Sequence, residues 1–100
     1  MDHREINAAA DEISRIIALD PDDIDDAAIA AQYDRWQQAG LAIRRLPTLR
    51  DMTDRLNHNI TRLKGWPRSD SAERAKLVSD TQQLCRAIVV EAHVIDHEGP

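Results

Sequence analysis

Two histidines near the end of the chain have the spacing of a metal site on a helix. His93 and His97 are four residues apart, which places two imidazoles on one side of a helix. Asp96 and Glu98 lie beside them, and His3 is the candidate for a ligand from elsewhere in the chain. The other interpretation is a solvated helix end, where histidine is favourable next to the negative end of the helix dipole. We favour the helix end and predict no bound metal.

The single cysteine, Cys85, is the candidate nucleophile. A catalytic thiol needs a cationic, partly exposed setting, whereas Cys85 falls on the apolar stripe of the last predicted helix, where we expect it to be buried. One cysteine also excludes an intramolecular disulfide, which fits a reducing compartment. No GxSxG sequence, phosphate-binding loop or dinucleotide-binding motif is present. The sequence therefore predicts neither an enzyme nor a cofactor.

Acidic side chains are most concentrated near residue 20. Five aspartates fall within seven residues, and they are Asp20, Asp22, Asp23, Asp25 and Asp26. The first three suit a helix start, because Pro21 fits the first helical position and carboxylates are favourable at the positive helix end. Helix capping at that position leaves Asp25 and Asp26 without a local role. We therefore predict an anionic surface that docks on a basic surface of a partner, including one that normally holds nucleic acid.

Basic side chains gather in the middle of the chain. Residues 35–68 hold eight basic and two acidic residues, whereas residues 1–34 hold two basic and ten acidic ones. The second candidate binding set is the basic third helix with the tryptophan at its end, and it consists of Arg50, Arg55, Arg62, Lys64 and Trp66. Tryptophan beside arginine is typical of the residues that dominate protein interfaces.

The basic residues have two further interpretations. Arginine can read base edges, so a small nucleic-acid-binding regulator that uses the third helix is the alternative function. The net charge of −5 argues against it, because a nucleic-acid-binding domain is usually basic. The acidic and basic segments can also simply attract each other within the molecule, as exposed ion pairs commonly do.

The length of 100 residues predicts a single domain that spans residues 1–100. Phenylalanine is absent and aromatic residues make up 3%, so isoleucine, leucine and alanine must form the core. No apolar run approaches the length of a membrane span, and the first residues do not resemble a signal peptide. We expect a cytoplasmic protein with no membrane partner. The excess of 11 arginines over 2 lysines is typical of GC-rich bacteria and their phages.

Apolar residues recur at intervals of three and four along the whole chain, which is the period of a helix. The pattern predicts an all-α bundle of about four helices, over residues 3–19, 21–46, 49–64 and 71–96. The residues that we expect in its core are Leu56, Ile60, Leu63, Leu84 and Ile88.

Caps and helix breakers predict where the helices begin and end. Asp20 is expected to cap the second helix and Pro47 to end it, with Gly40 either kinking it or letting a neighbour approach closely. Thr48 has the position of a cap for the third helix. Gly65 is expected to supply a left-handed residue at the end of that helix.

Together these features predict a non-enzymatic protein-binding module that occupies a surface of a larger protein or nucleoprotein complex. Small acidic proteins without catalytic motifs are typical of the inhibitors that phages and plasmids encode, anti-CRISPR proteins among them. Homodimerisation is a further prediction, because apolar residues extend beyond one stripe on the last and first helices. These residues are Val89, Val90, Val94, Ile17 and Leu19.

Overall fold

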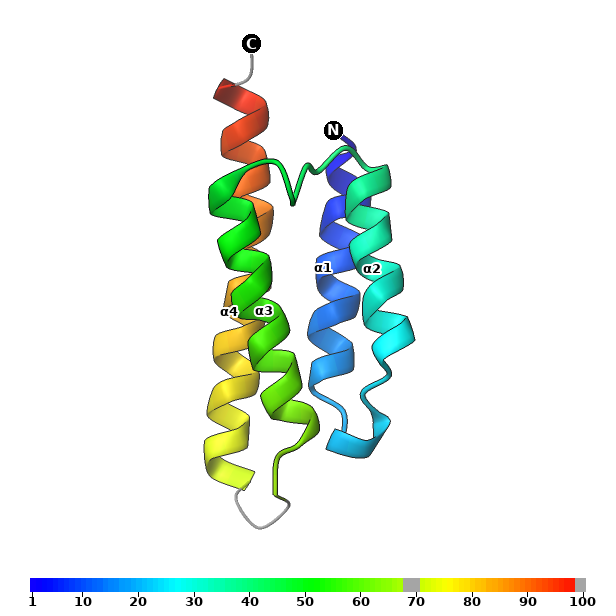
Figure 1. Cartoon of the computed structure of the whole chain (residues 1–100), viewed down its shortest axis with the longest axis vertical. Coiled ribbons are helices and arrows are strands. Elements are labelled where there is room, and N and C mark those ends of the chain that lie inside the picture. The colour runs from blue at the N-terminus through cyan, green and yellow to red at the C-terminus, as the bar shows by residue number, and fades with distance from the viewer. Residues whose placement is uncertain (68–70, 99–100) are drawn as a thin grey trace.

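The stretches of helical periodicity form an all-α bundle in the computed structural model, which describes residues 1–67 and 71–98. Over these residues the helices are α1 (His3–Ile17), the short 3-10 helix η1 (Pro21–Asp23), α2 (Asp26–Gln38), α3 (Pro47–Lys64) and α4 (Ser71–Glu98). None of the described residues forms a strand. The four α-helices run alternately down and up the long axis of the molecule (Figure 1). The predicted fold class is confirmed.

Three of the four edges of the bundle are closed by helix packing. α1 lies against both α2 and α4, and α3 lies against α4. α2 and α3 approach each other less closely and form the fourth edge (Figure 1). The bundle is elongated, with extents of 50 × 21 × 19 Å.

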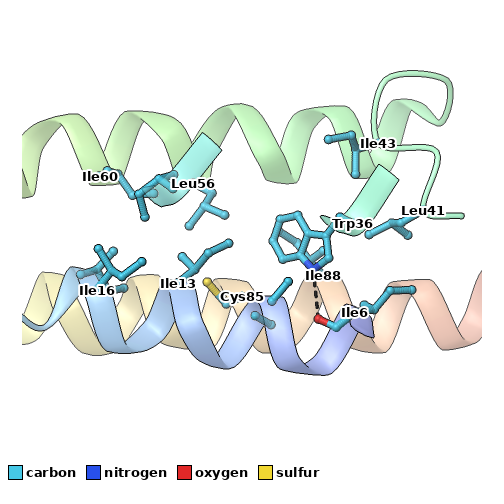
Figure 2. Close-up of a cluster of buried hydrophobic side chains, with 14 of the residues drawn as sticks. Ile6, Ile13, Ile16, Trp36, Leu41, Ile43, Leu56, Ile60, Cys85 and Ile88 are labelled. Carbon is cyan, nitrogen blue, oxygen red and sulfur yellow. Dashed lines mark hydrogen bonds between the residues drawn. The ribbon is translucent and has the colours of Figure 1, made fainter. Parts of the chain in front are cut away.

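Trp36 places a large aromatic ring in the interior of the bundle, in a chain that contains no phenylalanine. Its side chain is fully buried, and its Nε1 donates a hydrogen bond of 3.0 Å to the carbonyl oxygen of Ile6 on α1 (Figure 2). This bond satisfies the polar atom of the indole, which a buried tryptophan requires. Ile13, Leu56 and Ile88, from α1, α3 and α4, belong to the same buried cluster (Figure 2).

Four of the five predicted core residues are buried. Leu56, Ile60, Leu63 and Ile88 are at most 4% exposed, and Leu84 is half-buried against the same cluster. Ile17, which we expected to help form a dimer surface, is instead completely buried, because it faces the core from the last turn of α1. Val90 and Val94 are exposed, as the prediction of a dimer surface requires.

The prediction of a single helix over residues 21–46 is wrong. η1 ends at Asp23, and extended backbone at Ile24 and Asp25 separates it from α2. Ile24 is buried, so this break turns an apolar side chain into the core. The side chain of Asp25 then accepts a hydrogen bond of 3.0 Å from the backbone N–H of Ala27 and caps α2. Asp20, the predicted cap, makes no such bond.

Gly40 ends α2 rather than kinking it. Its φ of 97° is left-handed, and it donates a backbone hydrogen bond to Gln37 while Leu41 donates one to Trp36. This pair of bonds is the Schellman motif, which satisfies carbonyls at the end of a helix. A Cβ on Gly40 would lie 3.4 Å from the Cγ of Met1, which is an ordinary van der Waals contact, so the left-handed φ and not a close neighbour calls for glycine here.

The predicted ends of the third helix need correction. Pro47 is the first residue of α3 and does not end a preceding helix, which fits its missing N–H and restricted φ. Leu46 takes the capping position without a side-chain hydrogen bond, so Thr48 is not the cap. Gly65 has a φ of −93° and is not left-handed, because its N–H continues the helical pattern to Thr61.

Within the described residues, no helix combines the length and the apolar character needed to cross a membrane.

The two glycines at helix ends give a matched test of this geometry. Gly40→Ala should destabilise the protein by roughly 1–2 kcal/mol, because alanine is disfavoured in the left-handed region. Gly65→Ala should change stability by less than about 0.5 kcal/mol, since its φ is ordinary and its new Cβ would meet only Thr61 at 3.9 Å. Urea denaturation followed by circular dichroism measures both. Equal losses in the two variants would contradict the assignment of the two helix ends.

Candidate functional site

The predicted acidic surface is an exposed segment at one end of the bundle. Its five aspartates, Asp20, Asp22, Asp23, Asp25 and Asp26, all have exposed side chains and surround η1. Two of them do have local roles, contrary to the expectation from the sequence. Asp25 caps α2, and Asp26 forms an ion pair with Lys64 on α3. The prediction that Asp25 and Asp26 have no local role, which was the reason for assigning them to a partner, is therefore wrong.

Part of the predicted basic set lies at the same end of the molecule. η1 contacts α3, and the Lys64–Asp26 ion pair joins the two charged segments. The guanidinium carbon of Arg62 lies 5.7 Å from the ring centre of Trp66, which is half-buried. The Arg74 guanidinium of α4 donates a hydrogen bond to the carbonyl oxygen of Leu19, just before the acidic segment.

The ion pair between Asp26 and Lys64 shows that attraction within the molecule accounts for a small part of the separation of acidic and basic residues along the chain. The side chain of Asp26 is 75% exposed and that of Lys64 34%. Pairs at such exposure contribute under about 1 kcal/mol, because water screens them. Asp20 and Asp23 make no hydrogen bond or ion pair through their side chains within the described residues. Their charges are available to another molecule.

The predicted basic residues do not form one continuous surface. Arg50 and Lys64 are separated by fourteen residues of α3, or about 21 Å along the helix. Arg55 and Arg62 are exposed and, seven residues apart, share one side of α3. Lys64 pairs with α2, whereas Arg50 lines a cleft beside that helix at the opposite end of the bundle. The structure therefore divides this set among three places.

The cleft beside Arg50 lies between α2 and α3 and has a volume of ≈ 500 Å³. Tyr33 from α2 and Asn57 from α3 line it, and the tyrosine hydroxyl donates a hydrogen bond of 2.6 Å to the Asn57 Oδ1. Burial raises the pKa of Tyr33 above its ordinary value. Arg44 contributes a second guanidinium.

The histidine candidates for metal binding form a different arrangement. His3 stacks on His93 with ring centres 4.1 Å apart and planes 8° from parallel, and its Nε2 lies 2.7 Å from the Asp96 Oδ2. The hydrogen bond from His3 lowers the pKa of the Asp96 carboxyl. No group of three or more histidine, cysteine or acidic residues in the described chain is placed to hold a metal ion. These contacts join the start of α1 to the end of α4.

Cys85 is completely buried on α4, as its sequence position predicts. Burial raises the pKa of its thiol to about 11. The thiolate is the nucleophilic form of cysteine, so this side chain is protonated and unreactive at neutral pH. Cys85 acts as a small apolar side chain of the core.

Sequence reasoning did not bring Tyr33, Arg44 and Asn57 together as a site. They come from α2, from the segment that follows it and from α3, and only the antiparallel packing of the two helices places them around one cleft. The sequence does contain one signal for this arrangement. Arg50, Asn57 and Lys64 follow one another at intervals of seven residues, which places them on the same side of α3.

Comparisons of the chain with protein-family models, with curated proteins and with solved structures find no match. A function is therefore inferred from the residues and geometry of this chain alone.

The assignment of the α2 cap can be tested with two single variants. Asp25→Ala should destabilise the protein by about 1 kcal/mol, because the backbone N–H of Ala27 loses its acceptor. Asp20→Ala should leave the stability unchanged, since its side chain makes no capping bond. Thermal melting at neutral pH measures both, and the reverse order of effects would restore Asp20 as the cap.

Proposed function

We propose that the protein is a non-enzymatic binding module that occupies a surface of a larger partner and docks through its acidic end, residues 20–26. The observation that carries this proposal is the exposure of all five aspartates on a segment where the fold uses only some of them. Asp20 and Asp23 carry unpaired charges among the described residues. Such charges are favourable next to a basic surface and unfavourable next to each other.

The shape of the bundle supports docking by its end. The molecule is 50 Å long and about 20 Å across, and the acidic end is one of its two narrow ends (Figure 1). A narrow anionic end can enter a basic groove that would otherwise hold nucleic acid. Blocking such a groove needs no chemistry from the bundle itself, and it is how an inhibitor of the anti-CRISPR kind can act.

A nucleic-acid-binding regulator remains the alternative, with less support. α3 offers Arg55 and Arg62 together on one exposed side, but Lys64 is engaged by Asp26 and Arg50 lies at the other end of the helix. Two arginines neutralise few phosphates, and affinity for nucleic acid depends on their number.

Two double variants distinguish the surfaces. Asp20→Asn with Asp23→Asn removes two charges without touching the cap or the ion pair, and Arg55→Gln with Arg62→Gln is the matched control on α3. The parent protein is used to capture partners from a bacterial lysate at low salt, and the association rate of the captured protein is then measured for each variant. We expect the aspartate variant to associate roughly tenfold more slowly at low salt, because charge complementarity mainly sets the association rate.

Two results would contradict the proposal. In the first, the aspartate variant associates as fast as the parent while the arginine variant fails to bind, which places recognition on α3. In the second, the parent binds random duplex DNA with an affinity that falls steeply with salt, as a phosphate-binding protein does. Circular dichroism spectra of both variants should match the parent, because all four side chains are exposed.

A further inference from the structure

Polar side chains bridge the open edge of the bundle at regular intervals. Asp26 of α2 pairs with Lys64 of α3, and Tyr33 of α2 donates a hydrogen bond of 2.6 Å to Asn57 of α3. The step between the two bridges is seven residues on each helix, in opposite directions along the chain. Seven residues are about two helical turns, so both bridges lie on the same edge of the antiparallel pair.

A further seven residues along the sequence, the same spacing reaches Arg50 on α3 and residue 40, which follows α2. α2 has already ended at Gln38, and residue 40 is a glycine that forms the left-handed turn. Arg50 instead shares a cleft with Gln37 from the last turn of α2. Within the described residues its guanidinium has no ion pair and no hydrogen bond, and its side chain is exposed. No third polar bridge therefore joins Arg50 to α2 within the described residues.

A cleft of ≈ 500 Å³ opens beside Arg50, between the last turns of α2 and the first turns of α3. The volume is that of a site for a small molecule, and the lining has the usual division between apolar and polar groups. Ile43 and Thr53 are buried in the lining and Tyr33 is half-buried there, while Arg44 and Arg50 supply two guanidinium groups.

The charges around the cleft select the kind of anion. A guanidinium group binds a carboxylate or a phosphate through two parallel hydrogen bonds. Asp34 and Asp54 also line the cleft, so two negative charges lie near the two positive ones. A phosphate dianion or a nucleic-acid backbone is repelled by these aspartates more strongly than a single carboxylate is.

We propose that this cleft binds a small molecule with one carboxylate and a compact apolar or aromatic body. Its carboxylate pairs with Arg50, as the carboxylate of Asp26 pairs with Lys64. Its body lies along Tyr33 and Ile43. This site is at the opposite end of α3 from the acidic segment, and it does not depend on the docking function proposed above.

Benzoate and its neutral analogue benzamide are suitable probes, because they share a shape and differ in the charge. Titrations are followed by two-dimensional amide NMR of the labelled full chain. We expect benzoate to give saturable shifts at Tyr33, Ile43, Arg44, Arg50 and Thr53, and benzamide to give none. Arg50→Gln should weaken benzoate binding roughly tenfold, because a charge-assisted hydrogen bond is lost. Arg55→Gln, a change of the same type on the far side of α3, should leave it unchanged.

Several results would overturn the proposal. Absence of saturable shifts with benzoate, or equal shifts with benzamide, shows that no carboxylate site is present. Equal weakening in the two arginine variants shows a general attraction for anions, and equally strong binding of inorganic phosphate contradicts the proposed selectivity. Binding of a capped peptide with one glutamate, with no binding of benzoate, assigns the cleft to a protein partner instead. A large fall in the melting temperature of Arg50→Gln would show that Arg50 has a structural partner.

Discussion

The hydrogen bond from the Trp36 indole to the Ile6 carbonyl sets the position of α2 on the bundle. Trp36 is the one fully buried aromatic side chain among the described residues, in a chain without phenylalanine, and Tyr33 packs partly buried against it. An indole inside an apolar core must keep a partner for its N–H, and this one is on α1. The carbonyl of the same residue accepts the backbone bond from Leu41 that closes the helix, so one residue joins the packing of α2 to its termination.

This arrangement explains why the edge between α2 and α3 is the open one. α2 is held to α1 by the tryptophan, while α3 is held to α4 by its apolar stripe. The two hairpins then meet through α1 and α4 and around the shared interior, which leaves α2 and α3 to be joined by polar side chains. Polar bridges at an exposed edge contribute little to stability. They are therefore free to differ in chemistry from one step to the next.

The sequence predicted the helices well where one stripe of apolar residues carries the information, as in α1 and α3. The prediction of one continuous helix failed at Ile24 and at residues 39–46. The position of a helix end there depends on which of two short segments buries an apolar side chain. Aspartate is a favourable capping residue, so Asp20 and Asp25 are both candidates from the sequence. Only the packing of Ile24 into the core selects Asp25. The clustering of the acidic residues was visible in the sequence, whereas the cleft was not, since its lining comes from segments joined only by tertiary packing.

The short length of α2 produces both candidate surfaces. α2 has 13 residues, against 18 in α3 and 28 in α4, so it spans about 20 Å beside helices of about 27 and 42 Å. At its start, the break at Ile24 leaves Asp20 and Asp23 outside the helix and without an ion pair in the described residues. At its end, Gln37 lines the cleft beside Arg50, which makes no ion pair in the described residues. The charges on which the two proposals rest, those of Asp20, Asp23 and Arg50, thus lie near the two ends of this helix.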